Sequence, residues 1–83
     1  MTQSNVPSRL RSVLADVFGV PPEQISDETG AGKLEGWDSF GHLQAILALE
    51  AEFGVQFDPQ RIPELTTVSK LRAWLEAKGV IAA

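Results

Sequence analysis

The chain has 83 residues, 43% of them hydrophobic and 22% charged, which is the size and composition of one globular domain. Its net charge of −4 disfavours binding to nucleic-acid phosphates, which requires clustered Lys and Arg, and favours a basic partner surface. There is no cysteine and a single histidine, His42, so these residue types can form neither a disulfide nor a metal site.

The first residues, 1–5, are polar and contain no apolar segment of the kind that a signal peptide needs. No apolar run approaches the roughly 18 residues that span a bilayer, so we expect no membrane segment. The lack of cysteine fits a reducing compartment, and we expect a cytoplasmic protein. The sequence suggests a free-standing protein, although an excised domain would look similar. Its predicted organisation is a flexible N-terminus at 1–5, a folded domain at 6–80 and a C-terminal tail at 81–83.

A first helix is predicted after Pro7, a residue that suits an opening turn. Its apolar residues recur at helical spacing along one stripe, namely Leu10, Val13, Leu14, Val17 and Phe18. Gly19 ends this helix, and Pro21 and Pro22 turn the chain away, because two prolines cannot continue a helix.

A long connection rich in Gly and Asp follows at 26–37. We expect Ile25 and Leu34 to anchor it on the core and Trp37 to clamp its end. Long loops in compact domains are usually functional.

Two binding motifs in this connection are incomplete. Residues 29–33 resemble a phosphate-binding loop, but the earlier glycine is missing and Leu34 replaces the required Ser or Thr. A calcium loop beginning at Asp27 would have Ala31, which lacks a side-chain oxygen, at its fifth position. Neither motif predicts a site.

The second predicted helix opens at Asp38 and Ser39 and stops at Gly54. Both opening residues are of types that cap helices, so spacing alone allows Ser39 to be only a cap. The helical period predicts that one arc faces the core, formed by Leu43, Ile46, Leu49 and Phe53. Phe40 and Leu47 lie beyond the edge of that arc.

Further on, Asp58 and Pro59 predict a single helical turn that runs through Ile62 and is cut short by Pro63. Thr66 or Thr67 then caps a last helix, which Lys78 and Gly79 close. The apolar stripe of this helix comprises Val68, Leu71, Trp74 and Leu75. The sequence therefore predicts an all-α fold, a small bundle of three main helices and one short helix with a long first loop.

The opening Asp38-Ser39-Phe40, the segment 49–53 and the Thr66-Thr67-Val68 start of the last helix occur in an order that resembles the acyl and peptidyl carrier proteins. The resemblance extends from about Val6 to Val80. It implies that a transferase attaches 4′-phosphopantetheine from coenzyme A to Ser39, and that the arm's thiol carries acyl or aminoacyl groups as thioesters.

The same resemblance implies which partner proteins the chain has, and the charge and the lack of a long apolar run exclude nucleic acid and membrane. We expect a phosphopantetheinyl transferase, an enzyme that loads the cargo and a downstream transferase or synthase, with no nucleic acid and no membrane. The chain itself is expected to be a monomer and not an enzyme. Beyond Ser39, His42 and scattered carboxylates it offers no group of residues for turnover chemistry.

Two departures from the family pattern bear on the pathway. Phe40 stands where the family usually has Leu, and Gly41, His42 and Gln44 stand where fatty-acid carriers are typically acidic. Less charge weakens electrostatic steering toward basic partners. The sequence therefore favours polyketide, nonribosomal peptide or related antibiotic biosynthesis over housekeeping fatty-acid synthesis.

Several side chains keep two interpretations. Phe40 and Leu47 are either packed at the edge of the core or exposed for docking. His42 either touches the arm or is a half-buried imidazole bonded to the first loop. Gly41 either permits a close approach of a partner or the arm, or is simply tolerated in a first turn.

The remaining side chains have simpler interpretations. Glu50 and Glu52 are expected to be solvated, although they would supply charge to an interface. Trp37 and Trp74 are expected to be core and loop-clamp residues. If Ser39 is never modified, the alternative is a helical binding module that acts through Phe40, Leu47 and the acidic end of the second helix.

Overall fold

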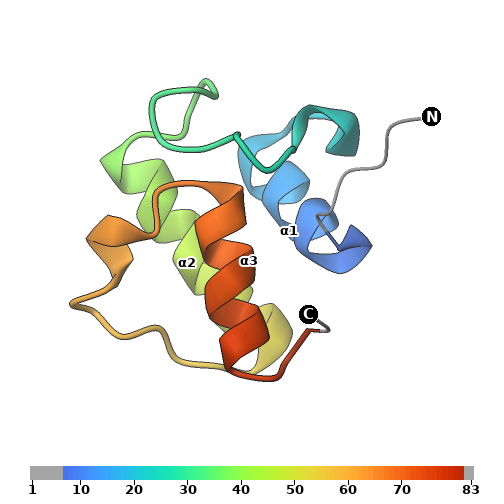
Figure 1. Cartoon of the computed structure of the whole chain (residues 1–83). Helices are drawn as coiled ribbons and strands as arrows, with labels where there is room; N and C mark the ends of the chain where they lie inside the picture. The colour runs from blue at the N-terminus through green and yellow to red at the C-terminus, as the bar shows by residue number, and fades with distance from the viewer. Residues whose placement is uncertain (1–6, 82–83) are drawn as a thin grey trace.

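A computed structural model describes residues 7–81 of the chain, and it is all-α (Figure 1). The elements are the helices α1 (Ser8–Phe18), α2 (Ser39–Phe53) and α3 (Val68–Ala77), with the 3₁₀ turns η1 (Pro22–Gln24) and η2 (Ile62–Glu64). Residues 7–81 form no strand, only an isolated bridge between Gly30 and Thr67. The predicted all-α bundle is confirmed. The flexible N-terminus expected at 1–5 and residues 82–83 of the expected C-terminal tail at 81–83 lie outside the described residues.

Helix α1 buries Leu10, Leu14 and Ala15, and its other apolar residues pack against the core at its rim. It ends, as predicted, at Gly19, whose backbone is left-handed with φ 65°. Helix α2 ends in the same way at Gly54, with φ 66°. The helical periodicity and the stop signals therefore predicted both ends correctly.

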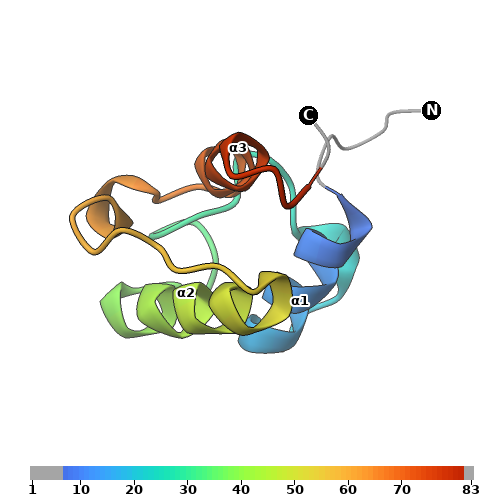
Figure 2. The ribbon, with the colours of Figure 1, turned by 90° about the horizontal axis from the view of Figure 1, so that it is seen from below.

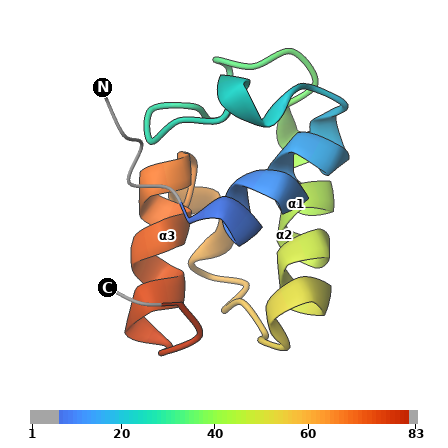
Figure 3. The ribbon, with the colours of Figure 1, turned by 90° about the vertical axis from the view of Figure 1, so that its right-hand side faces the viewer.

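Helices α2 and α3 run in the same direction, and α1 crosses them obliquely (Figures 1 and 3). Viewed from below, α3 lies across the molecule from α2, with the segment between Gly54 and η2 passing between them (Figure 2). The largest fully buried side chains among the described residues belong to the core that the helices enclose: Trp37, Leu10, Leu14, Ile25, Ile46, Leu49, Leu71, Leu75 and Val68. Because α2 and α3 are parallel, both begin at the same end of the molecule.

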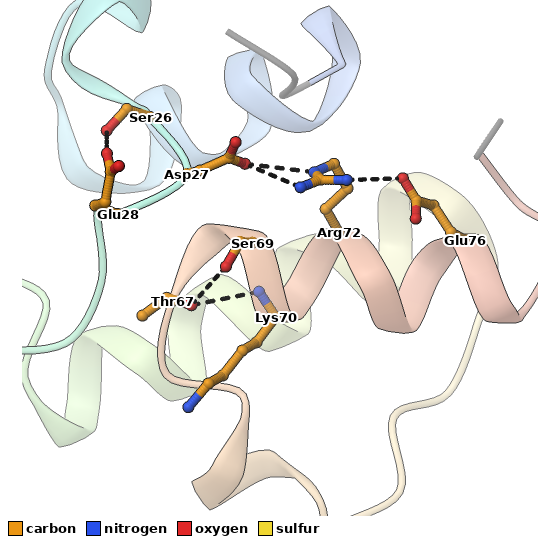
Figure 4. Close-up of polar contacts among 8 residues, drawn as sticks. All are labelled: Ser26, Asp27, Glu28, Thr67, Ser69, Lys70, Arg72 and Glu76. Atoms are coloured by element: carbon orange, nitrogen blue, oxygen red, sulfur yellow. Dashed lines mark hydrogen bonds and ion pairs between the residues drawn. The ribbon is translucent and has the colours of Figure 1, made fainter.

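The connection 26–37 lies across that end and caps α3. The carbonyl of Thr29 accepts the Val68 N–H at 2.8 Å, and the carbonyl of Asp27 accepts the Ser69 N–H at 3.1 Å. Arg72 of α3 bridges the Asp27 carboxylate at 3.3 Å and the Glu76 carboxylate at 3.0 Å (Figure 4). The long loop is thus fastened to α3 by backbone and side-chain bonds.

Two short elements correct the sequence analysis. The turn η1 was not expected, but its prolines occupy opening positions, where the missing N–H costs nothing. The turn predicted to end before Pro63 was misplaced. Residues 59–61 form only turns, and η2 begins at Ile62 with Pro63 inside it. Asp58 accepts the Gln60 N–H at 2.9 Å and so organises the preceding turn instead of capping a helix.

The predicted core-facing arc of α2 was too wide. Leu43 is 48% exposed, while Ala45, His42 and Gly41 are buried beside Ile46. The physical reason is angular: at about 100° per residue, Leu43 lies only about 60° from Phe40, nearer to the exposed face than to the centre of the buried one.

Candidate functional site

Ser39 is exposed and is the first residue of α2. Asp38 before it has an extended backbone, and its carboxylate accepts the Gly41 N–H at 2.9 Å. The cap is therefore Asp38, which leaves the Ser39 hydroxyl free of that role. Within the described residues, the backbone N–H groups of Ser39 and Phe40 donate to no acceptor. Such free N–H groups at a helix start favour an anion.

Trp37 fixes the direction in which the chain enters α2. The indole is 1% exposed and stacks on Phe18 of α1, with ring centroids 4.7 Å apart. Its Nε1–H donates to His42 Nδ1 at 3.0 Å. Trp37 precedes the cap and His42 lies on the first turn, the two positions that form a hydrophobic staple. The predicted clamp at Trp37 is confirmed, and it orients the Asp38-Ser39 opening.

His42 is 8% exposed, and its two ring nitrogens both have partners. Nδ1 accepts from Trp37, and Nε2 lies 2.9 Å from the carbonyl oxygen of Ile62. Of the two interpretations, the imidazole bonded to the first loop is confirmed through Trp37. The bond to Ile62 could not be foreseen, because that residue is distant in the sequence.

Gly41 is buried against the end of the first loop. An added Cβ would overlap the carbonyl oxygen of Gly36 and would lie 3.1 Å from the Phe18 ring. The close approach at Gly41 is thus an internal contact between α2, the loop and α1. An internal contact therefore explains the glycine, and a close approach of a partner or the arm at Gly41 stays a prediction.

A mostly apolar groove of about 670 Å³ lies beside Ser39. Its lining includes Trp37, His42 and Leu43 together with Ile62 and Pro63 of η2. Sequence analysis missed the η2 wall, because no local pattern shows that a segment about 20 residues downstream folds back beside Ser39. The structure therefore joins Ser39, His42 and Leu43 in one groove.

The outer face of α2 is apolar and exposed. Phe40 is 70% exposed, Leu47 54% and Leu43 48%, so the first two are not packed at the edge of the core. A second hollow of about 380 Å³ adjoins Phe40 on the α1 side, away from the groove. Between Ser39 and Glu50 the helix carries no Asp, Glu, Lys or Arg.

The acidic residues near the end of α2 have internal partners. Glu50 accepts the Phe57 N–H at 2.9 Å, and Glu52 pairs with Arg9 of α1 at 2.6 Å. Glu52 is exposed, as expected, and its pair with Arg9 lies on the surface, whereas Glu50 is only half-exposed and bonds to the backbone. The tertiary fold brings α1 and the chain after Gly54 within reach of these carboxylates.

Trp74 stacks on Phe57 at 4.0 Å between ring centroids, as expected of a clamp residue. Within residues 7–81, no group of three or more His, Cys, Asp or Glu side chains is arranged to hold a metal ion. Nor is any described helix both long and apolar enough to cross a bilayer.

Comparison with known proteins matches residues 8–75 to the family described as "Phosphopantetheine attachment site". A protein named "Acyl carrier protein" from Thermosynechococcus vestitus is 30% identical over 78 residues, covering 94% of this chain and 96% of that protein. Another with the same name, from Phaeodactylum tricornutum, is 29% identical over 69 residues, covering 83% and 91%. These similarities extend over nearly all of the described fold.

Proposed function

The chain belongs to the acyl carrier protein family, whose members carry covalent 4′-phosphopantetheine, and from this we propose that Ser39 is its attachment residue. The observation that carries the proposal is that Ser39 is exposed at the start of α2. The helix is capped by the Asp38 side chain, so the Ser39 hydroxyl is not used as the cap. No other described serine combines this position with an adjoining apolar groove.

The residues around Ser39 fit the phosphodiester end of the group. The free N–H groups of Ser39 and Phe40 and the positive end of the helix dipole favour a negative charge there. The Asp38 carboxylate is engaged by the Gly41 N–H, which occupies one of its oxygens. The groove beside Ser39 offers apolar surface to the part of the arm that leaves the helix.

When attached, the group supplies a terminal thiol that holds acyl or aminoacyl cargo as a thioester. The chain's own contribution is to present Ser39 and to dock on enzymes that act on the cargo. We propose a carrier without turnover chemistry, served by a phosphopantetheinyl transferase, a loading enzyme and a downstream transferase or synthase. The exposed apolar residues Phe40, Leu43 and Leu47 support docking through α2.

We further propose that the pathway is polyketide, nonribosomal peptide or related specialised biosynthesis. The support is the uncharged outer face of α2 between Ser39 and Glu50, which offers little steering to basic enzymes. A housekeeping fatty-acid carrier is the alternative, and the name of the two relatives, "Acyl carrier protein", does not distinguish the two pathways. Loading assays with malonyl, longer acyl and aminoacyl donors and their cognate enzymes separate these pathways. Cytoplasmic location, the monomeric state and the domain limits 6–80 remain predictions.

The attachment is tested by intact mass after incubation with coenzyme A and a broad-specificity phosphopantetheinyl transferase. We expect one added phosphopantetheine on the wild type and none on Ser39→Ala. Ser8→Ala is the matched control, because Ser8 is also an exposed serine at the first position of a helix. It should gain the group like the wild type.

Two results would contradict the proposal. A mass gain on Ser39→Ala that disappears in Ser8→Ala would move the attachment to another serine. No gain on any folded variant would favour the unmodified binding module, which acts through the exposed apolar face of α2 alone.

A further inference from the structure

A hollow of about 360 Å³ lies where the residues flanking η2 meet the second half of α3. It shares no lining residue with the groove beside Ser39. The lining combines apolar residues with two cations and includes no acidic residue: Leu65, Ala73, Trp74, Ala77, Arg61 and Lys78. We call this site the cationic hollow.

The apolar part of the cationic hollow is built around Trp74. Its indole stacks on Phe57, with ring centroids 4.0 Å apart, and Lys78 Nζ lies 5.1 Å from its centroid. The indole is only partly buried, and the neighbouring residues Ala73 and Ala77 are exposed and short. The hollow therefore offers a firmly held aromatic surface with open space beside it, the kind of feature that receives an apolar side chain of a partner.

The two cations of the hollow are available to carboxylates from outside. Lys78 is exposed, and no carboxylate of residues 7–81 lies within 4.0 Å of its ammonium group. Arg61 pairs with Glu64 at 3.0 Å, but the two side chains are 55% and 66% exposed. Exposed pairs of this kind contribute little to stability, so Arg61 can exchange Glu64 for another carboxylate.

Charge complementarity indicates the kind of partner. The chain has a net charge of −4, whereas the lining of the hollow is positive. Nucleic acids and anionic membranes require larger clusters of Lys and Arg, and the net charge of the chain would repel them. A short protein segment that places carboxylates beside an apolar side chain matches two cations beside an indole.

We propose that the cationic hollow docks an acidic segment of a partner protein. The carboxylates of this segment pair with Arg61 and Lys78, and an apolar side chain enters beside Trp74. Since α2 and α3 are parallel, the second half of α3 lies toward the end of the molecule away from Ser39 (Figures 1 and 3). A partner held there leaves Ser39 and the apolar face of α2 accessible to a second protein. The docking does not depend on attachment at Ser39.

The test is an NMR titration of the unmodified protein with a synthetic peptide in which glutamates flank a phenylalanine. We expect the indole N–H of Trp74 and the amides of Ala73 and Ala77 to shift, with a Kd below about 1 mM. The indole of Trp37, which is 1% exposed, reports on the fold and should not shift. A peptide with glutamines in place of the glutamates should bind at least about fivefold more weakly, because it cannot form the ion pairs.

Lys78→Gln tests the hollow itself, and it should weaken binding of the acidic peptide at least about threefold. Lys33→Gln is the matched control, because it removes the same charge from an exposed lysine of the first loop, outside the hollow. It should leave the Kd within about 1.5-fold of the wild type.

Several results would overturn the proposal. Equal weakening by Lys78→Gln and Lys33→Gln would assign the binding to net charge alone. An unshifted Trp74 indole, or equal affinity for the acidic and the glutamine peptide, would show that the hollow does not select carboxylates. A shift of Trp74 with vesicles of anionic phospholipid and not with the peptide would identify a lipid surface as the ligand instead of a protein.

Discussion

At position 41 a neighbouring segment, and not the residue's own backbone conformation, leaves no room for a side chain. It lies within α2, where alanine would ordinarily be favoured by about 1 kcal/mol. An added methyl group would instead meet the Gly36 carbonyl and the Phe18 ring. The site needs glycine here because the loop that presents Ser39 passes directly over the helix.

We predict that Gly41→Ala lowers the free energy of unfolding by about 1–3 kcal/mol, the usual cost of overpacking. Denaturant unfolding measures the change. Gln44→Ala on the exposed face of the same helix is the control and should change stability by less than about 0.5 kcal/mol. Stabilisation by Gly41→Ala would show that the loop is not seated on α2 as described.

Helix α3 obtains its N-terminal bonds from two sources. Thr67 accepts the Lys70 N–H (Figure 4). Carbonyls of the first loop accept the first two N–H groups of the helix, those of Val68 and Ser69. The sequence left Thr66 and Thr67 as equal candidates for the cap. The structure assigns Thr67, because its hydroxyl accepts the Lys70 N–H at 3.3 Å.

We predict that Thr67→Ala destabilises the protein by about 1 kcal/mol, the typical value of an N-cap. Thr66→Ala, which keeps every backbone bond, should cost less than about 0.5 kcal/mol. Thermal unfolding of the two variants under identical conditions makes the comparison. Equal costs would mean that the Thr67 hydroxyl does not cap α3.

The clamp between the loop and α3 is electrostatic as well. The hydrogen bond from Arg72 to Glu76, followed by the charge of Asp27, raises the pKa of Arg72 above its ordinary value. A raised folded-state pKa gives stability that is present below the unfolded pKa and is lost only as pH rises through the folded one. Arg72 therefore remains charged throughout the neutral range, and its share of the clamp is constant there.

The molecule as a whole presents two different surfaces. Its net charge is −4, yet the outer face of α2 next to Ser39 is apolar and carries no exposed charge before Glu50. Further along the helix, Glu50 accepts the Phe57 N–H and Glu52 forms an ion pair with Arg9. Docking near Ser39 is thus expected to depend on apolar contact more than on long-range attraction.

We predict that the initial rate of modification by a phosphopantetheinyl transferase, at limiting carrier, falls less than about threefold between about 50 and 300 mM salt, since screening weakens only charged contacts. Gln44→Glu adds a carboxylate to the same face and should make the rate more sensitive to salt. A steep salt dependence of the wild type, unchanged in Gln44→Glu, would show that charges elsewhere direct docking.

Much of the fold could be predicted because its determinants are local. The apolar period and the glycine stops defined α1 and α2, and the order of short motifs along the chain was sufficient to indicate the family. The errors have two causes. Glu50 was misassigned and the packing at Gly41 was missed because their environments are made by segments distant in the sequence, namely the chain at Phe57 and the loop at Gly36. Leu43 was misassigned because of its angular position on α2, close to the exposed Phe40.

The sequence by itself determined that the chain is a small helical bundle with a serine at the opening of its second helix, since helix periods, caps and stops act over a few residues. Only the tertiary structure decided what surrounds that serine. Trp37, His42 and Ile62 are joined by hydrogen bonds between residues up to 20 positions apart, and the parallel course of α2 and α3 brings η2 beside the groove. Such juxtapositions arise from packing the whole core, which no local pattern encodes.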